Sequence, residues 1–99
     1  MEYQLRHFRI REGTMDAFLD AWLRGVYPLR RKFGFTFAGA WVVEGADEFV
    51  WIIGYDGPEG FAAADKRYYE SIERKLISPD PAEYIEAPLN RMMRSGLPD

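Results

Sequence analysis

The sequence contains no cysteine and a single histidine, His7. The lack of cysteine excludes disulfides, thiolate nucleophiles and cysteine-ligated metal sites. A metal site built on His7 would need further ligands converging from elsewhere, and no such pattern surrounds this residue. We therefore expect neither a metal site nor a cofactor, and the composition fits a reducing compartment such as the cytoplasm.

Long apolar runs and an excess of positive charge are also missing. No stretch approaches the roughly 20 apolar residues that span a bilayer, and residues 1–12 are charged throughout, unlike a signal peptide. The net charge of −3 and the pI near 5.2 disfavour a basic face for nucleic acid. The sequence thus predicts a cytoplasmic protein with no membrane span and no nucleic-acid partner.

Aromatic residues, by contrast, are abundant, at 16% of a 99-residue chain. A chain of this length forms one domain, and so small a globule buries only about 60–65% of the surface that its unfolded chain exposes. Such a domain is short of core. Pairing with a second copy is a common remedy, so we expect a homodimer.

Hydrophobic periodicity predicts four strands and two main helices. Strands are expected at residues 3–10, 35–44, 48–55 and 86–94. The first helix has an apolar stripe at spacings of three and four residues, from Met15 to Phe33, with Pro28 as a kink and Gly34 after its end. The second helix opens near Pro58 and runs to Leu76, and a short third helix starts at Asp80. The order is β-α-β-β-α-β, which is an α+β, ferredoxin-like plan with a four-stranded antiparallel sheet.

The two middle strands form a hairpin, whose loop decides which residues share a face. If the loop is the three residues 45–47, Trp41 lies opposite Trp51 and both belong to one aromatic face. That face is too apolar for water, and the small aliphatic residues of the other face suit close helix packing. We therefore expect the aromatic face in the dimer interface, with these candidates: Phe37, Trp41, Phe49, Trp51 and Ile53.

Several short motifs resemble the NIPSNAP family over nearly the whole chain. They are residues 3–8, Gly13 and Met15, residues 26–30 and 32–35, Gly39 and Trp41, Tyr55-Asp56, and Asp80-Pro81. The resemblance implies a single domain over residues 1–99, in which two ferredoxin-like sheets pair into a dimeric α+β barrel. The wider superfamily includes cofactor-independent monooxygenases, isomerases and haem enzymes, whereas the NIPSNAP branch has no well-defined general reaction. Where the family carries a histidine on the third strand, this chain has Trp51, and the following family tryptophan is Ile53.

Ligand-binding residues are expected among arginines and aromatic side chains. The pocket candidates are Arg6, His7, Trp41, Trp51, Tyr55, Tyr68 and Arg91. Arg6, which matches the family motif, could hold a ligand carboxylate or form a structural ion pair. His7 could be a general base or a haem ligand, but a lone strand histidine is more often structural. The rings could line a pocket or pack as a solid core. No catalytic residue can be assigned.

Two kinds of function remain open. One is a homodimer that binds a small apolar or aromatic molecule, or acts on it as a cofactor-independent monooxygenase or isomerase. The other is a non-catalytic interaction module with a solid dimer core. A cavity between the two sheets of the dimer, lined by polar groups near Arg6, Trp41 and Tyr55, separates the two, and the sequence alone does not decide whether the chain is an enzyme.

Overall fold

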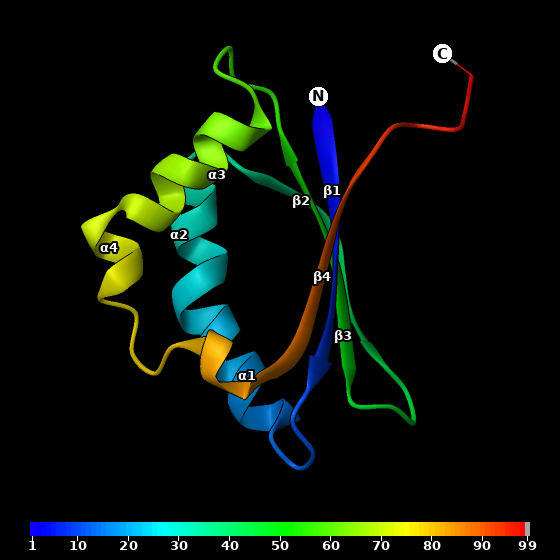
Figure 1. Cartoon of the computed structure of the whole chain (residues 1–99), viewed down its shortest axis with the longest axis vertical. Helices are drawn as coiled ribbons and strands as arrows, with labels where there is room; N and C mark the ends of the chain where they lie inside the picture. The colour runs from blue at the N-terminus through cyan, green and yellow to red at the C-terminus, as the bar shows by residue number, and fades with distance from the viewer. Residues whose placement is uncertain (99) are drawn as a thin grey trace.

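A computed structural model describes residues 1–98 and consists of one sheet and one layer of helices (Figure 1). The elements are β1 (Glu2–Ile10), α1 (Met15–Ala21), the π-helical turn η1 (Trp22–Val26), α2 (Tyr27–Lys32), β2 (Thr36–Val43), β3 (Glu48–Tyr55), α3 (Phe61–Glu70), α4 (Ile72–Lys75), the 3₁₀ turn η2 (Pro81–Tyr84) and β4 (Ile85–Met93). The predicted α+β, ferredoxin-like order of elements is confirmed. Within residues 1–98, no helix has both the length and the apolar character needed to cross a bilayer.

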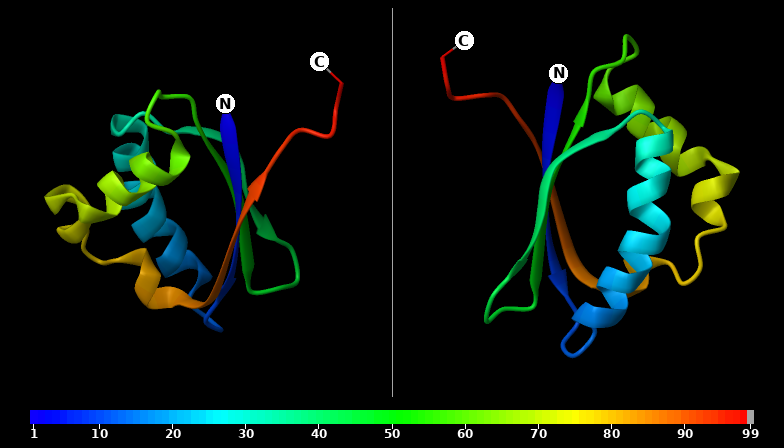
Figure 2. Two further views of the ribbon diagram at one scale, coloured as in Figure 1. Left: turned by 45° about the horizontal axis from the view of Figure 1, so that its top comes forward. Right: turned by 180° about the vertical axis from the view of Figure 1, so that it is seen from behind.

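The four strands form one antiparallel sheet in the order β2-β3-β1-β4. Both views in Figure 2 show all the helices on one side of this sheet, with the other side uncovered. We call these two sides the helix face and the open face. Because β1 and β3 occupy the middle of the sheet, their side chains on the helix face lie deepest in the protein.

The first helical segment is continuous from Met15 to Lys32, as the apolar stripe predicts, but it is not uniform. The turn η1 is wider than an α-helical turn and ends just before Tyr27, whose N–H donates to the carbonyl of Trp22. Pro28 follows directly at the start of α2, where its missing N–H is tolerated. Gly34, with φ of 90°, takes the left-handed conformation that ends the helix.

The second predicted helix is interrupted at Ser71. This residue has an extended backbone that ends α3, and its hydroxyl oxygen accepts a hydrogen bond of 3.1 Å from the N–H of Arg74. Ser71 is therefore the N-cap of the separate helix α4. The apolar stripe in the sequence runs on past Ser71 to Leu76, so it did not reveal the break. In the structure, α4 buries none of its residues.

The predicted hairpin register is wrong by one residue. The loop spans the four residues 44–47, so that Trp41 lies opposite Val50 and Val43 opposite Glu48. A slip of one residue moves a side chain to the other face of the sheet. A bulge between Phe37 and Gly39 then returns Phe37 to the face that holds its partner Ile53.

The register places the aromatic side chains of β3 beneath the helices. Phe49, Trp51 and Ile53 are buried by their own chain, and Phe37 is partly buried against them. Placing these four residues at a dimer interface is therefore wrong, because that inference required helices on the opposite face. Trp41 alone among the five candidates lies on the open face, where its ring covers Gly39 so closely that a Cβ there would clash.

Trp22 of η1 stands at the centre of the core. Its ring centroid lies 5.1 Å from that of Phe49, 5.3 Å from that of Trp51 and 5.7 Å from that of Phe37. Phe18, one helical turn earlier, packs edge-on against Phe49 at 5.0 Å. These edge-to-face contacts join the first helical segment to β2 and β3.

We expect Phe49→Ala to lower the free energy of unfolding by about 3–5 kcal/mol, because it leaves a cavity under Phe18 and Trp22. Urea denaturation followed by circular dichroism measures the loss. The control is Ile72→Ala, an exposed site on α4 that should change stability by no more than about 0.5 kcal/mol. A small effect of Phe49→Ala would contradict its place in the core.

Candidate functional site

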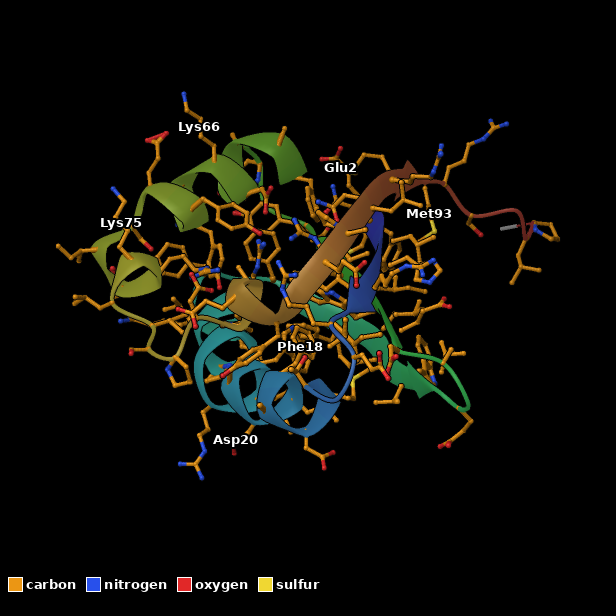
Figure 3. The ribbon with its side chains drawn as sticks, turned by 60° about the horizontal axis from the view of Figure 1, so that its bottom comes forward. Glu2, Phe18, Asp20, Lys66, Lys75 and Met93 are labelled. Atoms are coloured by element: carbon orange, nitrogen blue, oxygen red, sulfur yellow. The ribbon has the colours of Figure 1, made fainter. Side chains whose placement is uncertain are left out.

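A cavity of about 290 Å³ lies between the helix layer and the sheet. Its walls come from the middle strands β1 and β3, from the first helical segment, and from α3 and α4. Exposed residues of η2 and β4, among them Ala82 and Asn90, form its outer rim. Figure 3 shows Phe18, which lines the cavity, inside the molecule between helices and sheet, whereas Lys66 and Lys75 point outward.

Two buried arginines share one carboxylate beside this cavity. Arg6 projects from the helix face of β1 and Arg30 from α2, and both side chains are almost fully shielded from solvent, at 2% and 0% exposure. Asp65 of α3 accepts from Arg6 Nη2 at 3.1 Å and from Arg30 Nη1 at 2.7 Å, both through Oδ1. The charges of β1, α2 and α3 are thus joined in one buried cluster, where solvent screens them little.

Aromatic rings surround the two guanidinium groups. The Arg30 guanidinium carbon lies 3.8 Å from the ring centroid of Tyr68 and 4.7 Å from that of Phe35. Arg6 lies 5.2 Å from the Trp51 ring and donates from Nη1 to the hydroxyl of Tyr69 at 2.8 Å. Cation–π contacts of this kind offset part of the cost of burying the charges.

A third arginine, Arg74 of α4, reaches the cavity from the side. Its Nη2 donates to Asp80 Oδ1 at 3.0 Å, and the same oxygen accepts from the N–H of Ala82 at the start of η2. Burial is the largest single effect and opposes the charge on both side chains, but their hydrogen bonds and mutual attraction together outweigh it, so the pKa of Arg74 is raised and that of Asp80 lowered. This pair holds η2, and with it the rim of the cavity, against α4.

Several buried donors at the cavity have no acceptor within residues 1–98. They are the Nε1 atoms of Trp22 and Trp51, Nε and Nη2 of Arg30, the hydroxyl of Tyr68 and Nε of Arg74. Burial raises the pKa of the Tyr68 hydroxyl, which therefore stays protonated at neutral pH. Burial, followed by repulsion from Arg6, lowers the pKa of Arg30. The site offers hydrogen-bond donors, and both nearby carboxylates, Asp65 and Asp80, are already bound to arginines.

The structure brings together only part of the predicted pocket. Arg6, Trp51 and Tyr68 line the cavity. Trp51 occupies the position at which the family resemblance implies a histidine, so that an indole replaces an imidazole at the cavity wall.

The other candidates lie elsewhere. His7, Trp41 and Arg91 belong to the open face, as their cross-strand partners show. Tyr55 is on the helix face outside the cavity lining, and its hydroxyl bonds Glu59, which raises the pKa of Tyr55.

His7 Nε2 lies 2.5 Å from Glu48 Oε1 across the strands, within hydrogen-bonding distance. Two half-exposed side chains at the surface do not make a metal site. Among residues 1–98, no group of three or more His, Asp or Glu side chains is placed to hold a metal ion.

Sequence reasoning missed Trp22, Arg30 and Arg74 as site residues. A signal for Arg30 exists in the sequence: Trp22, Val26 and Arg30 follow at intervals of four and share one helix face, so the arginine interrupts an apolar stripe. A charge within such a stripe is buried only when it is paired or bound. Arg74 has no such signal in the sequence. Its side chain reaches the cavity because helix α4 changes direction at Ser71, and the sequence pattern did not predict that break.

The fold and the cavity define a ferredoxin-like α+β protein with a ring-lined chamber between helices and sheet. The NIPSNAP family profile matches residues 3–95. The chain therefore belongs to the NIPSNAP family. Among curated proteins, none matches it significantly.

Solved structures share this fold at low sequence identity. An uncharacterized NIPSNAP domain protein from Burkholderia xenovorans matches with a TM-score of 0.83 at 19% identity, over 100% of both chains. A NIPSNAP family protein with unknown function from Agrobacterium tumefaciens matches with a TM-score of 0.82 at 20% identity, over 94% of this chain and 86% of that one. An antibiotic biosynthesis monooxygenase matches with a TM-score of 0.73 at 15% identity, over 99% and 100%.

We expect Asp65→Asn to lower the free energy of unfolding by about 3–5 kcal/mol, because it leaves two buried guanidinium groups facing each other without a counter-charge. Thermal and urea unfolding measure this loss. The matched control is Asp20→Asn, which breaks an exposed pair with Arg24 on the helix surface and should cost no more than about 0.5 kcal/mol. Equal losses in the two variants would show that the buried cluster contributes no more to stability than the exposed ion pair does.

Proposed function

We propose that this NIPSNAP protein binds a small, ring-bearing organic molecule in the cavity between its helices and its sheet. The observation that carries the proposal is the cavity itself, about 290 Å³ in volume and lined by aromatic rings together with a few polar groups. Binding sites for small molecules have this composition, with an apolar wall and a small number of placed donors.

A binding role is favoured over a catalytic one by the chemistry of the lining. Asp65 and Asp80 are held by arginines, and Tyr68 keeps its proton, so that none of these three groups is poised as a general base. The second candidate, a cofactor-independent monooxygenase or isomerase, is supported by the fold shared with the antibiotic biosynthesis monooxygenase, and a shared fold is weak support for a shared reaction. Turnover of a bound compound would favour that candidate.

We expect 2-naphthol, which is neutral at pH 7, to bind the cavity and quench the fluorescence of Trp22 and Trp51, which line it. Ala82→Trp, at the exposed rim, should weaken binding at least about 10-fold by filling the entrance, as measured by calorimetry. The control is Ala62→Trp, an exposed position on α3 that is not part of the lining. Equal affinity of both variants would place the binding site outside this cavity.

We also propose that the open face pairs with the open face of a second copy. Its large apolar side chains include Trp41, 53% exposed, Leu89, 44% exposed, and also Val43 and Met93. Trp41 and Val43 belong to β2, and Leu89 and Met93 belong to β4; cross-strand pairing places all four on the same face of the sheet. Monomeric proteins rarely leave so wide an apolar surface in water. The resemblance to dimeric α+β barrels points to the same partner.

Trp41→Asp should convert the dimer to a monomer, because an interface would then bury an unpaired charge on each copy. Sedimentation velocity at micromolar concentration measures the change in mass. The matched control is Leu23→Asp, an equally exposed apolar residue of η1 on the helix side of the molecule, which should remain dimeric. A wild-type chain that sediments as a monomer would disprove the pairing.

The cytoplasm is the location that we propose for this activity, because a chain without cysteine suits a reducing compartment. Cell fractionation with an antibody against the protein would test it.

A further inference from the structure

The unpaired buried donors are gathered at one place. Their atoms belong to five residues, and all five line the cavity: Trp22, Arg30, Trp51, Tyr68 and Arg74. A buried donor without an acceptor costs about 1–3 kcal/mol, and native proteins contain only a few such groups per 100 residues. Their concentration around a single cavity indicates that a molecule rich in acceptors belongs there.

The charges at the cavity do not balance. Three guanidinium groups, those of Arg6, Arg30 and Arg74, face only two carboxylates, because Asp65 Oδ1 serves both Arg6 and Arg30. One positive charge therefore remains uncompensated among the described residues at this site. Burying a charge of this kind is favourable only when an opposite charge pairs with it.

Arg30 has one edge that suits a carboxylate. Its Nη1 is bound to Asp65, whereas Nε and Nη2 have no acceptor within residues 1–98. In a guanidinium group, Nε and Nη2 carry two parallel N–H bonds on the same edge, which match the two oxygens of a carboxylate. Arg30 is fully buried and lines the cavity, so water screens this edge little.

We propose that the ligand of this cavity is an aromatic carboxylate with a single negative charge, whose two oxygens are held by Nε and Nη2 of Arg30. The ring lies against Trp22 and Trp51, and the hydroxyl of Tyr68 supplies a further donor. This inference rests on the proposed binding function. It adds the charge of the ligand and names Arg30 as the residue that recognises this charge.

The experiment compares 2-naphthoate with 2-naphthamide, which has the same shape without the charge, by calorimetry on the wild-type protein. We expect naphthoate to bind at least about 10-fold more tightly, since a charge-assisted bidentate pair is about twice as strong as a neutral one. Arg30→Lys keeps a positive charge for Asp65 but loses the second N–H edge. It should therefore reduce the preference for naphthoate over naphthamide, measured as the ratio of the two affinities in the same variant.

A second variant guards against poor folding of Arg30→Lys. Tyr68→Phe removes a hydroxyl that has no partner among the described residues, so the protein should remain at least as stable, while naphthoate affinity falls about 3- to 10-fold. The matched controls are Arg67→Lys and Tyr27→Phe, neither of which lines the cavity. Both should bind naphthoate as the wild type does.

The outcomes separate the two proposals. If naphthamide binds as tightly as naphthoate, or if neither Arg30→Lys nor Tyr68→Phe changes the preference, the carboxylate assignment is overturned and the binding cavity stands. If neither compound binds, both proposals fail. If naphthoate is preferred and the preference survives both controls but not Arg30→Lys, the assignment is supported.

Discussion

The sharing of one carboxylate by two buried arginines holds this structure together. Asp65 on α3 binds Arg6 from the sheet and Arg30 from the first helical segment, so that a single oxygen links three elements of the fold, β1, α2 and α3. The arrangement also leaves a positive excess inside the protein, because one negative charge cannot balance two. In the proposed binding mode, Arg30 serves both stability and recognition.

Most of the backbone plan could be read from the sequence. The stripe from Met15 to Phe33, the left-handed Gly34 and the cap at Asp80 are local signals, and local signals survive in the folded chain. Arg6 could also be anticipated as a pocket residue, because it lies on a central strand. The cavity itself could not be predicted, since it depends on how three separate elements pack against one another.

The hairpin shows why a small local uncertainty had a large consequence. Its loop and its bulge each add one residue, and each addition reverses the faces of the strand beyond it. Phe37 escapes the first reversal through the second, whereas Trp41 lies between them and faces outward. Composition gave no warning, because both faces of the hairpin carry apolar residues. The register error moved Trp41 alone among the five interface candidates. The other four share a face in either register, and their placement was wrong because the helices were expected on the opposite face.

The two faces of the sheet differ in what covers them. The helix face holds the cavity and its charges, and the open face is the surface proposed to associate with a second copy. Because adjacent residues on a strand point to opposite faces, His7 and Arg6 are neighbours in sequence yet belong to different surfaces. Substitutions in β1 can therefore alter the chamber or the pairing independently.

The packing of Trp22 against Trp51 has an optical consequence. Their centroids are 5.3 Å apart and their planes are inclined by 80°, a separation at which the electronic transitions of two indoles couple strongly. The far-ultraviolet circular dichroism of the protein should therefore contain a paired signal of opposite signs from these two indoles. Trp41, on the open face and half exposed in the single chain, should emit at longer wavelength than the buried pair in the monomer, and its emission should shift to shorter wavelength if the open face is covered. The chain thus carries two distinguishable sets of intrinsic chromophores, one on each face of its sheet.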